Sequence, residues 1–568
     1  MDKRLSIALL LTALVVAVTP ILFPTPRKTS PGTSATQTDS SLVSSSGPSQ
    51  AASKPLATVP LQAGSASIPA PVGTVTPIAG DSLATPGAPP TQGQTTSIVT
   101  SKAVYRFSNI GAELTSATMR GYKNLATKKG DVELQAPNKP LVSFALVLNR
   151  DTVNLNRAVF QVSQDQPDST ASSVTYKTSV AGSNVAISYK VDPQHYLVRL
   201  SGRVDGAASP AYLLISLPST LPATETDTMT DLRALAYSFK PQRENARGVP
   251  FEKLDPGEKR LEAGPLTWAA VKNKYFVVGL INEEKSAFEE MTLVGGARTS
   301  KVATSATATV VKAIKNNEFA FDMYVGPQQS AELLSVGRDF DHVNPYGWSF
   351  LQPVVNPIAA LCIKLLLWMH DHLKLSYGWV LIIFGVCIRI ILWPLNQSAM
   401  RSSMKMQEIQ PRLADVQKRY KDNPEKQREE MMKVYAEAGA SPFTALSGCL
   451  PMLIPMPVLF ALFFVFQNTI EFRGVPFLWL LDISVRDPYF ILPVLMGISM
   501  YLLSWIGMRN APPNPQAKMM MYMFPVMMTF ILANMASGLN LYYTAQNIAS
   551  LPQQWLLARE RAKARKQT

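Results

Sequence analysis

The sequence predicts a polytopic α-helical membrane protein that carries a large all-β domain outside the cytoplasm. Two patterns predict this class: six long apolar windows, and a stretch of period-two alternation between the first window and the second. A third feature bears on function, because Arg389 lies near the middle of an apolar window and none of the six windows contains Asp or Glu.

The six windows approach the ~20 residues that cross about 30 Å of hydrocarbon. They are Leu5–Phe23, Gly378–Ser398, Leu446–Gln467, Pro488–Gly507, Lys518–Asn534 and Gly538–Leu557. We interpret the first as a membrane anchor (1–23) and the other five as a helical core within residues 374–557.

Lys and Arg residues near the window ends predict the orientation, because cytoplasmic loops carry an excess of them. Lys3 and Arg4 precede the first window, and both the segment 399–445 and the tail 558–568 are rich in basic residues. The loop 468–487 and the turn near Ala536 carry few. We therefore expect both termini in the cytoplasm and the large domain outside.

The first window has an alternative interpretation as a cleaved signal peptide, since a basic start precedes its apolar centre. Ala17 and Thr19 are passable cleavage-site residues, but Pro20 would follow the bond and Ile21–Phe23 extends the apolar run. The pattern favours an uncleaved anchor.

Residues 24–100 are dominated by Ser, Thr, Pro, Ala, Gly and Gln and contain no aromatic residue. Such a segment buries too little apolar surface to offset its ordering entropy, so we expect a disordered linker. Residues 101–340 change to short alternating runs such as Val185–Val191 and Tyr196–Leu200. These runs, punctuated by Gly, Pro, Asn and Asp, predict an antiparallel β sandwich.

An amphipathic helix is expected to lie at the outer membrane interface within residues 349–373. It ends in His370-Asp371-His372, the one cluster that suggests a metal site. Adjacent residues point to different sides of a helix, so the spacing is poor for metal ligands and a solvated face is favoured. No nucleotide-binding or hydrolase motif occurs, and we expect no enzymatic activity, no cofactor and no metal.

Arg389 indicates a hydrophilic cavity within the membrane, because a charge at that depth costs roughly 3 kcal/mol on insertion scales. The last window adds a polar stripe, in which Asn540, Tyr543, Thr544 and Asn547 share one helical face. Together they predict a hydrophilic groove that receives substrate. The alternatives are snorkelling or carbonyl pairing by the Arg and interhelical hydrogen bonding by the stripe.

Two further patterns suggest surfaces for partners. The segment 518–528 holds a run of Met residues that includes Met520, Met523 and Met527, and flexible Met side chains suit a sliding surface for varied apolar helices. Gap filling or lipid contact is the simpler alternative. Residues 399–440 read as two helices broken at Asp422-Asn423-Pro424, and their apolar stripes predict a cytoplasmic hairpin that could receive ribosomes or nascent chains. The stripes include Ile409, Leu413, Tyr420, Met431 and Tyr435.

The residues of the C-terminal third resemble the YidC insertases, relatives of the mitochondrial oxidase-assembly and chloroplast thylakoid insertases. The motifs that carry the resemblance are Ile388-Arg389 with Pro394-Leu395, Met404-Lys405-Met406-Gln407, Gly448-Cys449-Leu450-Pro451 with Met456-Pro457, Asp487-Pro488-Tyr489-Phe490, Ser537-Gly538-Leu539, Tyr542-Tyr543, Asn547 and Gln553-Gln554. The outer domain resembles the family's β-supersandwich in Phe107–Leu114 and Lys272–Phe276. This points to the Gram-negative form with a large periplasmic domain.

The resemblance implies a chaperone and insertase of the bacterial inner membrane that acts without a through-pore or nucleotide hydrolysis. It adds Tyr542 to the groove and Met456 to the sliding surface. The implied partners are nascent membrane proteins, the Sec translocon, the lipid bilayer and, through the basic tail and the hairpin, the ribosome. No sequence-specific nucleic-acid partner is expected.

The chain departs from the family pattern at Pro455, in Thr444–Gly448 and at Gly385, where many relatives place a hydroxyl residue. These differences affect the cytoplasmic entrance and the groove lining. Two other functions remain as alternatives: a secondary transporter or channel, which commonly uses intramembrane carboxylates, and a membrane-anchored glycan-binding envelope protein, which leaves Arg389 unexplained.

Overall fold

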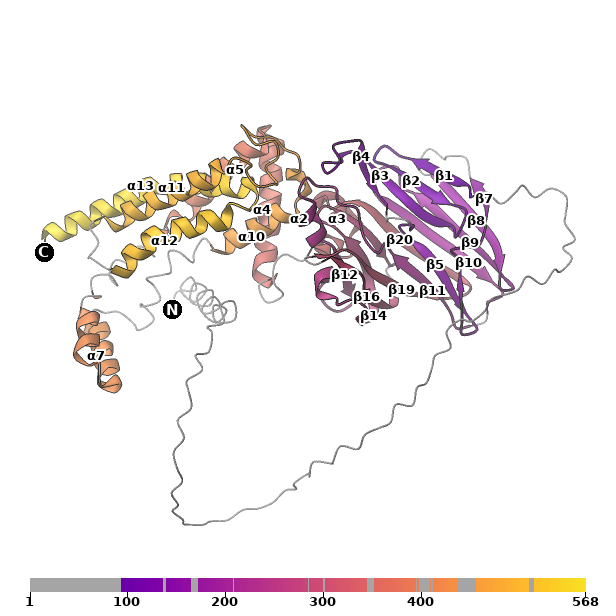
Figure 1. The fold of residues 1–568 in the computed structure, drawn as a ribbon, viewed down its shortest axis with the longest axis horizontal. Helices are drawn as coiled ribbons and strands as arrows, with labels where there is room; N and C mark the ends of the chain where they lie inside the picture. Colours follow the sequence, from indigo (N-terminus) through magenta and orange to yellow (C-terminus); the bar gives the residue numbers. More distant parts are fainter. Residues whose placement is uncertain are drawn as a thin grey trace, which may run out of the picture. The chain divides into compact units, whose positions relative to one another are not determined.

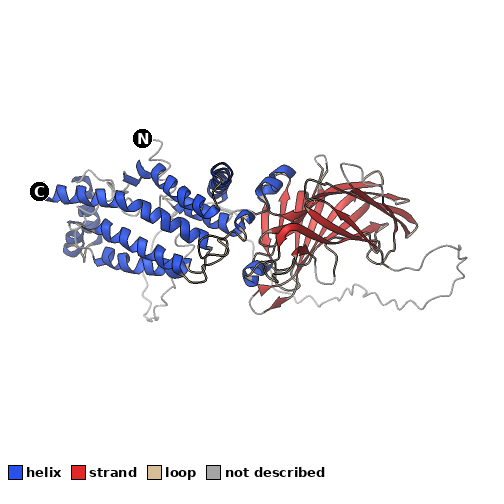
Figure 2. Ribbon diagram, turned by 90° about the horizontal axis from the view of Figure 1, so that it is seen from above, coloured by secondary structure: helices blue, strands red, loops and turns tan. Residues whose placement is uncertain are grey.

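The computed structural model describes residues 93–135, 139–164, 172–207, 209–283, 286–299, 302–344, 352–394, 396–397, 409, 412–437, 456–509 and 515–567. The predicted anchor (1–23) and most of the predicted linker (24–100) lie outside these residues. Strands and long helices occupy separate regions of the described chain (Figures 1 and 2).

Strands make up the region from residue 95 to residue 327. Two short α-helices, α2 (Thr228–Arg233) and α3 (Ser330–Val336), and two 3-10 turns, η1 (Phe251–Lys253) and η2 (Phe340–Val343), accompany them. The strands are β1 (Thr95–Val99), β2 (Ala103–Ser108), β3 (Glu113–Lys123), β4 (Asp131–Leu134), β5 (Ser143–Leu148), β6 (Asp151–Asn154), β7 (Gln161–Gln164), β8 (Ser172–Val180), β9 (Ser183–Val191), β10 (Leu197–Asp205), β11 (Ala211–Leu217), β12 (Ala236–Pro241), β13 (Arg247–Pro250), β14 (Lys259–Lys272), β15 (Phe276–Ile281), β16 (Phe288–Gly295), β17 (Arg298–Thr299), β18 (Val302–Ala303), β19 (Ala306–Ile314) and β20 (Glu318–Pro327).

The strands form a 14-stranded antiparallel sheet, a smaller sheet of β1 to β4 and a two-stranded sheet of β17 and β18. The first two sheets form the sandwich. Alternate residues of β11 and β19 are buried, as period-two patterning requires when one face of a strand packs on a core. The two sheets share that core, in which Phe107 of the small sheet contacts Tyr189 of the large one with ring centroids 4.6 Å apart. The predicted antiparallel sandwich is therefore present.

The β domain begins earlier than predicted. The sequence places its start at residue 101, but Thr95–Val99 forms β1 and pairs along its whole length with β2. Thr and Ser supply three of the five residues of β1, including one of the two buried positions, so the strand resembles the linker in composition.

The long helices of the C-terminal region are α4 (Gln352–Leu373), α5 (Tyr377–Ile391), α7 (Pro424–Glu437), α10 (Met456–Asn468), α11 (Ile491–Met508), α12 (Pro515–Leu532) and α13 (Ser537–Gln567), with a 3-10 turn η3 (Ile470–Phe472). The helices α4, α5, α10, α11 and α13 share one apolar core. The helix α13 packs against both α5 and α11, and it continues through most of the predicted basic tail.

The predicted count of six membrane spans is not confirmed. Within the described chain, Val354–Leu373 and Ile491–Met508 are long and apolar enough to cross a membrane, whereas Tyr377–Ile391, Val458–Asn468 and Met521–Leu532 are apolar but shorter. The segment Val354–Leu373 belongs to the helix that the sequence assigns to the membrane interface. Length and composition therefore do not distinguish an interfacial helix from a membrane span here. The first window and the start of the third lie outside the described residues.

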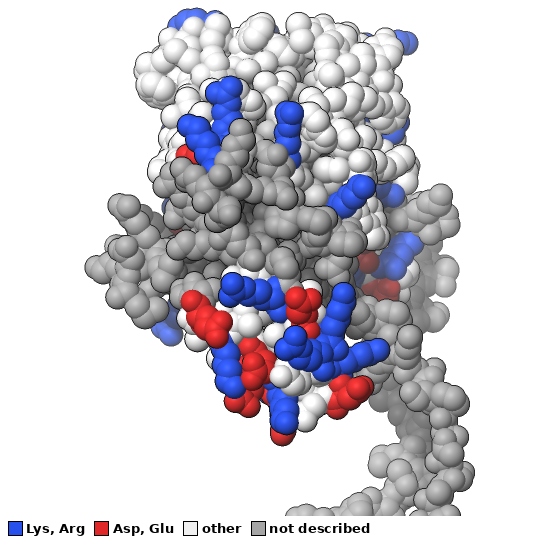
Figure 3. Space-filling model, turned by 90° about the vertical axis from the view of Figure 1, so that its left-hand side faces the viewer, with Lys and Arg blue, Asp and Glu red and all other residues white. Residues whose placement is uncertain are grey.

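The described part of the predicted cytoplasmic hairpin consists of Ile409 and residues 412–437, in which residues 412–419 and α7 are helical. Ile409, Leu413 and Tyr435 are buried together, with Met431 packed against them, while Tyr420 is half-buried outside this cluster. Charges of both signs cover the α7 surface (Figure 3), and Lys433 bridges Glu429 at 3.0 Å and Glu430 at 2.8 Å.

The loop 469–487 joins α10 to α11 and is attached to the β domain. Ile470 is buried in the core of the β domain. Arg473 Nε donates to Glu225 Oε1 at 2.8 Å, with 5% and 3% of the two side chains exposed, and Arg473 Nη2 donates to the Lys123 carbonyl at 2.8 Å. The outer loop and the β domain therefore share one buried polar junction.

Breaking this junction should destabilise the protein. The change Arg473→Met leaves the Glu225 carboxylate buried without its cation, and removing one member of a buried pair costs about 3–5 kcal/mol. We expect that loss in the free energy of unfolding measured by urea titration of the full chain in detergent. The matched control Arg203→Gln, at an exposed pair that solvent screens, should lower the free energy of unfolding far less, and equal losses in the two variants would contradict the assignment.

Glu113 of β3 should make the stability of the β domain depend on pH. Its side chain is buried, and Oε1 has no hydrogen-bond partner among the described groups. Burial raises its pKa from 4.5 to about 7. Because the folded state holds the proton more tightly than the unfolded state, stability falls as pH rises from 4.5 to about 7 and then levels off. The variant Glu113→Gln should unfold at a higher temperature than the wild type at pH 8, with a smaller difference at pH 5; a pH-independent difference would exclude this titration.

Candidate functional site

Arg389 lies in the last turn of α5, not in the middle of a continuous span as the sequence predicts. The helix ends at Ile391, three residues before Pro394, which has no backbone N–H with which to continue the helical hydrogen bonds. Residues 393–394 and 396–397 resume helical conformation. A cation in the last turn interacts favourably with the negative end of the helix dipole, which lowers the cost of placing Arg389 there.

The Arg389 side chain is 8% exposed and is held by a glutamine. Its Nη2 donates to Gln553 Oε1 of α13 at 2.6 Å, and Gln553 Nε2 donates to the Trp393 carbonyl at 3.2 Å. No ion pair links Arg389 to a carboxylate among the residues that the structure describes. The guanidinium is therefore positioned by a neutral partner and keeps its full charge.

The polar stripe of α13 is buried, as its residues Asn540, Thr544 and Asn547 are 0%, 8% and 8% exposed. Asn547 Nδ2 donates to Ser499 Oγ of α11 at 3.1 Å. Asn540 Nδ2 donates to the Leu532 carbonyl at the end of α12 at 3.0 Å. Part of the stripe therefore makes interhelical hydrogen bonds, which is the structural alternative that the sequence left open.

Arg389 contacts a side of α13 other than the one that carries the polar stripe. Gln553 lies six residues after Asn547, which corresponds to about 240° around a helix. Gln546 and Ser550, which precede Gln553 by about two turns and one turn, are buried with it. The sequence assigns no role to Gln553 or Ser499, although Gln553 belongs to a motif that carries the family resemblance. Its helical spacing from the buried Gln546 is the signal that would have identified it.

Four buried polar atoms near these contacts have no hydrogen-bond partner among the described protein groups: Arg389 Nε, Asn396 Nδ2, Asn540 Oδ1 and Tyr543 Oη. Asn396 lies beyond the end of α5, in the helical residues 396–397. Each unsatisfied buried group costs about 1–3 kcal/mol, and lipid cannot satisfy it. These groups favour contact with water or with a polar segment of another molecule.

Tyr542 packs between α13 and α5. It is 1% exposed, and its ring lies 5.9 Å from that of Phe384. A Cβ atom at Gly385 would lie 3.2 Å from the Tyr542 carbonyl oxygen and 3.3 Å from its ring, so a side chain there would push α5 and α13 apart. This close approach gives a physical reason for glycine at position 385.

The Met residues of α12 lie partly on an exposed apolar face. Met523 and Met527 are 52% and 41% exposed, and Met519, Val526 and Phe530 extend the face at helical spacing. The side chains of Met456 and Met520 are outside the described part of the chain. The two exposed Met residues are thus available to lipid or to another apolar helix.

The histidine cluster at the end of α4 makes local contacts. His370 Nδ1 lies 2.7 Å from the Leu375 carbonyl and its ring stacks on Tyr377, while the His372 ring stacks on Trp368. Among the described residues no group of His, Cys, Asp and Glu has the arrangement of a metal site.

Comparison with known families matches both halves of the chain. Residues 95–360 match the family model described as the YidC periplasmic domain, and residues 368–565 match the one described as the 60Kd inner membrane protein. The membrane protein insertase YidC of Prosthecochloris aestuarii is 30% identical over 415 residues, which cover 68% of each chain.

A second relative and one solved structure also resemble this chain. The membrane protein insertase YidC of Pelodictyon phaeoclathratiforme is 33% identical over 401 residues, which cover 65% of this chain and 64% of that relative. A crystal structure of an active YidC insertase is 17% identical and covers 81% of this chain and 92% of that chain, with a TM-score of 0.33. Because that score is low, membership of the family rests on the sequence matches alone.

The Asn547–Ser499 hydrogen bond should be measurable by a double-mutant cycle. Interhelical hydrogen bonds in membranes contribute about 0.6 kcal/mol on average. We expect Asn547→Val and Ser499→Ala to show a coupling energy of that size in unfolding measurements in detergent. Thr544→Val is the matched control, because Thr544 Oγ1 donates within its own helix to Asn540 O at 2.8 Å and should show no coupling to Ser499→Ala. Coupling of Ser499 to both positions alike would contradict the assignment.

Proposed function

The chain belongs to the YidC family of membrane protein insertases, and from this premise we propose that it inserts integral membrane proteins into the bacterial inner membrane and helps them to fold. The observation that carries the proposal is the buried Arg389 cation, which has a neutral partner in Gln553 and whose Nε has no hydrogen-bond partner among the described groups. A fixed positive charge in a partly wetted site can attract the polar outer segment of a client protein. It requires neither a through-pore nor nucleotide hydrolysis.

Electrostatics favours acidic clients. Two unit charges 4 Å apart attract by about 1 kcal/mol in bulk water and by about 4 kcal/mol at an effective dielectric constant of 20. Arg389 would therefore hold a client carboxylate more strongly than a solvated Arg could. Asn540, Tyr542, Tyr543, Thr544 and Asn547 would line the groove and accept the hydrogen-bonding groups of the client backbone. The unsatisfied atoms of Asn396 and Asn540 support this role.

Release into lipid needs only the transfer free energy of the client helix. Leu-like residues contribute about 0.3 to 0.6 kcal/mol each on insertion scales, or about 6 to 12 kcal/mol over ~20 residues. We propose that the helix leaves along α10 and α12, with Met456, Met520, Met523 and Met527 as its sliding surface. The exposure of Met523 and Met527 supports this path.

The proposed topology has six spans, cytoplasmic termini and a periplasmic β domain. The attachment of loop 469–487 to the β domain supports it, because the two must then lie on the same side of the membrane. The α7 hairpin and the basic end of α13 would remain in the cytoplasm. There Ile409, Leu413, Tyr420, Met431 and Tyr435 would shape a surface for ribosomes or nascent chains, and the core would cooperate with the Sec translocon.

The family assignment does not favour the two alternative functions. Ion-coupled transport commonly uses intramembrane carboxylates, and the windows of the C-terminal core contain none. A glycan-binding envelope protein would have no use for a buried cation between α5 and α13.

Removing the Arg389 charge should reduce insertion of acidic clients. We expect liposomes containing the wild type to insert a single-spanning client with an acidic outer tail, scored by protease protection. Arg389→Ala should lower that yield about tenfold or more, since it removes an attraction of a few kcal/mol. A client with a neutral tail should be affected less, and Arg412→Ala on the exposed hairpin is the control. Equal insertion by the wild type and Arg389→Ala for every client would make Arg389 structural, and no insertion above empty liposomes would refute the insertase function itself.

The change Gln553→Glu tests the charge of Arg389 separately from the packing of its side chain. Gln553→Glu puts a carboxylate where Gln553 Oε1 now accepts from Arg389 at 2.6 Å, so the fold should keep its thermal stability. Insertion of acidic clients should nevertheless fall toward the level of Arg389→Ala, because the cation is already paired. Undiminished insertion by Gln553→Glu would show that the free charge is unnecessary.

A further inference from the structure

A cavity of about 840 Å³ lies at the junction between the β domain and the outer ends of the helices. Its walls come from the start of α2, the end of α10, the loop 481–490 and the turn between α12 and α13. It adjoins the Arg473–Glu225 ion pair, since Thr226 and Asp227 follow Glu225 directly. It belongs neither to the Arg389 site nor to the apolar face of α12.

One part of the cavity wall is apolar. It is formed by side chains from the outer ends of the membrane helices and from the loop, namely Phe463, Phe466, Phe490, Met535 and Leu539. Exposed apolar residues continue around this region, with Leu481 86% exposed and Tyr489 68% exposed. Aromatic and aliphatic groups at such a level are typical of the membrane–water interface.

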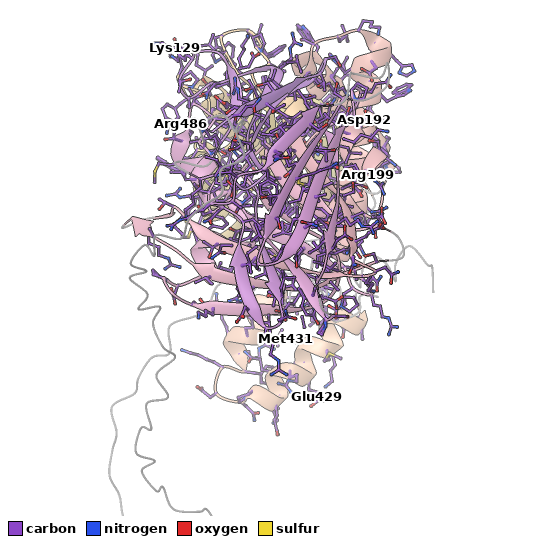
Figure 4. All side chains as sticks on the ribbon, turned by 90° about the vertical axis from the view of Figure 1, so that its right-hand side faces the viewer. Lys129, Asp192, Arg199, Glu429, Met431 and Arg486 are labelled. Carbon is purple, nitrogen blue, oxygen red and sulfur yellow. The ribbon has the colours of Figure 1, made fainter. Side chains whose placement is uncertain are left out.

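The other part of the wall carries charges of both signs. Lys274 and Arg486 supply cations, and Asp227 and Asp482 supply carboxylates. Asp482 is 8% exposed, and its Oδ1 accepts from the Ser484 backbone N–H at 2.8 Å. Its Oδ2 receives no hydrogen bond from the described protein groups. Arg486, labelled in Figure 4, is exposed and has no ion pair among the described residues.

We propose that this cavity binds a phospholipid with a primary-amine zwitterionic headgroup, phosphatidylethanolamine, from the outer leaflet. The ammonium group donates hydrogen bonds to Asp482 and Asp227, the phosphate accepts from Arg486 and Lys274, and the acyl chains lie along Phe463 and Phe490. Charge-assisted hydrogen bonds of this kind are short and strong. A choline headgroup has no N–H to donate, and a glycerol headgroup has no cation.

The bound lipid would link the β domain to the membrane core, because its headgroup contacts residues of both. Asp227 and Lys274 belong to the β domain, whereas Asp482 and Arg486 belong to the loop between α10 and α11. The inference depends on the membrane location of the helices and not on the action of Arg389. Its failure would therefore leave the proposed insertase function untouched.

Native mass spectrometry of the full chain in detergent can test this site. Short-chain phosphatidylethanolamine, phosphatidylcholine and phosphatidylglycerol would be titrated separately against the wild type, Asp482→Asn, Arg486→Gln and the control Arg203→Gln. We expect one phosphatidylethanolamine to bind the wild type about tenfold more tightly than either other lipid. Asp482→Asn should remove the preference over phosphatidylcholine, Arg486→Gln should weaken all three lipids, and Arg203→Gln should match the wild type.

Equal affinity for the three lipids in every variant would overturn the proposal, because it would indicate non-specific lipid contact. Arg486→Gln changes an exposed side chain, so it keeps the test valid if Asp482→Asn does not fold. A photocrosslinker placed at Phe490 adds a second readout in vesicles of phosphatidylethanolamine and phosphatidylglycerol. Crosslinks to lipid support the proposal, whereas crosslinks confined to the translocated segment of a client would replace the lipid with a peptide ligand.

Discussion

A buried positive charge without a buried negative partner is the constraint on which the rest of the membrane region depends. Arg389 can remain charged only if polar groups or water surround it, because hydrocarbon solvates neither the guanidinium nor unpaired backbone groups. The chain meets this need with Gln553, which holds the side chain at 2.6 Å without neutralising it. It also ends α5 at Ile391, so that the cation lies at the favourable end of a helix. A carboxylate would satisfy the same geometry but would remove the charge that a client is proposed to use.

The second organising feature is the attachment of the β domain to the loop between α10 and α11. Ile470 enters the core of the β domain, and the Arg473–Glu225 pair fixes the loop beside it. This loop also holds Asp487, whose carboxylate accepts the Leu492 backbone N–H at 2.8 Å at the start of α11. The β domain is therefore linked to α11 through this loop. A lipid bound in the cavity beside the junction would contact both the β domain and the loop.

The β domain, the core helices and the importance of Arg389 could be predicted from the sequence, because period-two alternation and long apolar runs are strong signals. The sequence did not reveal β1, whose Thr and Ser residues resemble the linker, or the end of α5 at Ile391. The partner of Arg389 was also missed. Of the predicted stripe, Asn540, Thr544 and Asn547 are buried and Tyr543 is half-buried, but hydrogen bonds across helices depend on how α13 is rotated between α5 and α11. Periodicity within one helix does not determine that rotation, so Gln553 and Ser499 became evident only in three dimensions.

The most direct measurement of the central claim is a charge reversal. Insertion of two clients that differ only in having an acidic or a basic outer tail would be compared in liposomes containing the wild type or Arg389→Glu. If Arg389 attracts the client electrostatically, the wild type prefers the acidic tail and Arg389→Glu prefers the basic one. If Arg389→Glu folds and inserts clients but keeps the wild-type preference, the charge at this position does not select the client, and the electrostatic role proposed for Arg389 is wrong.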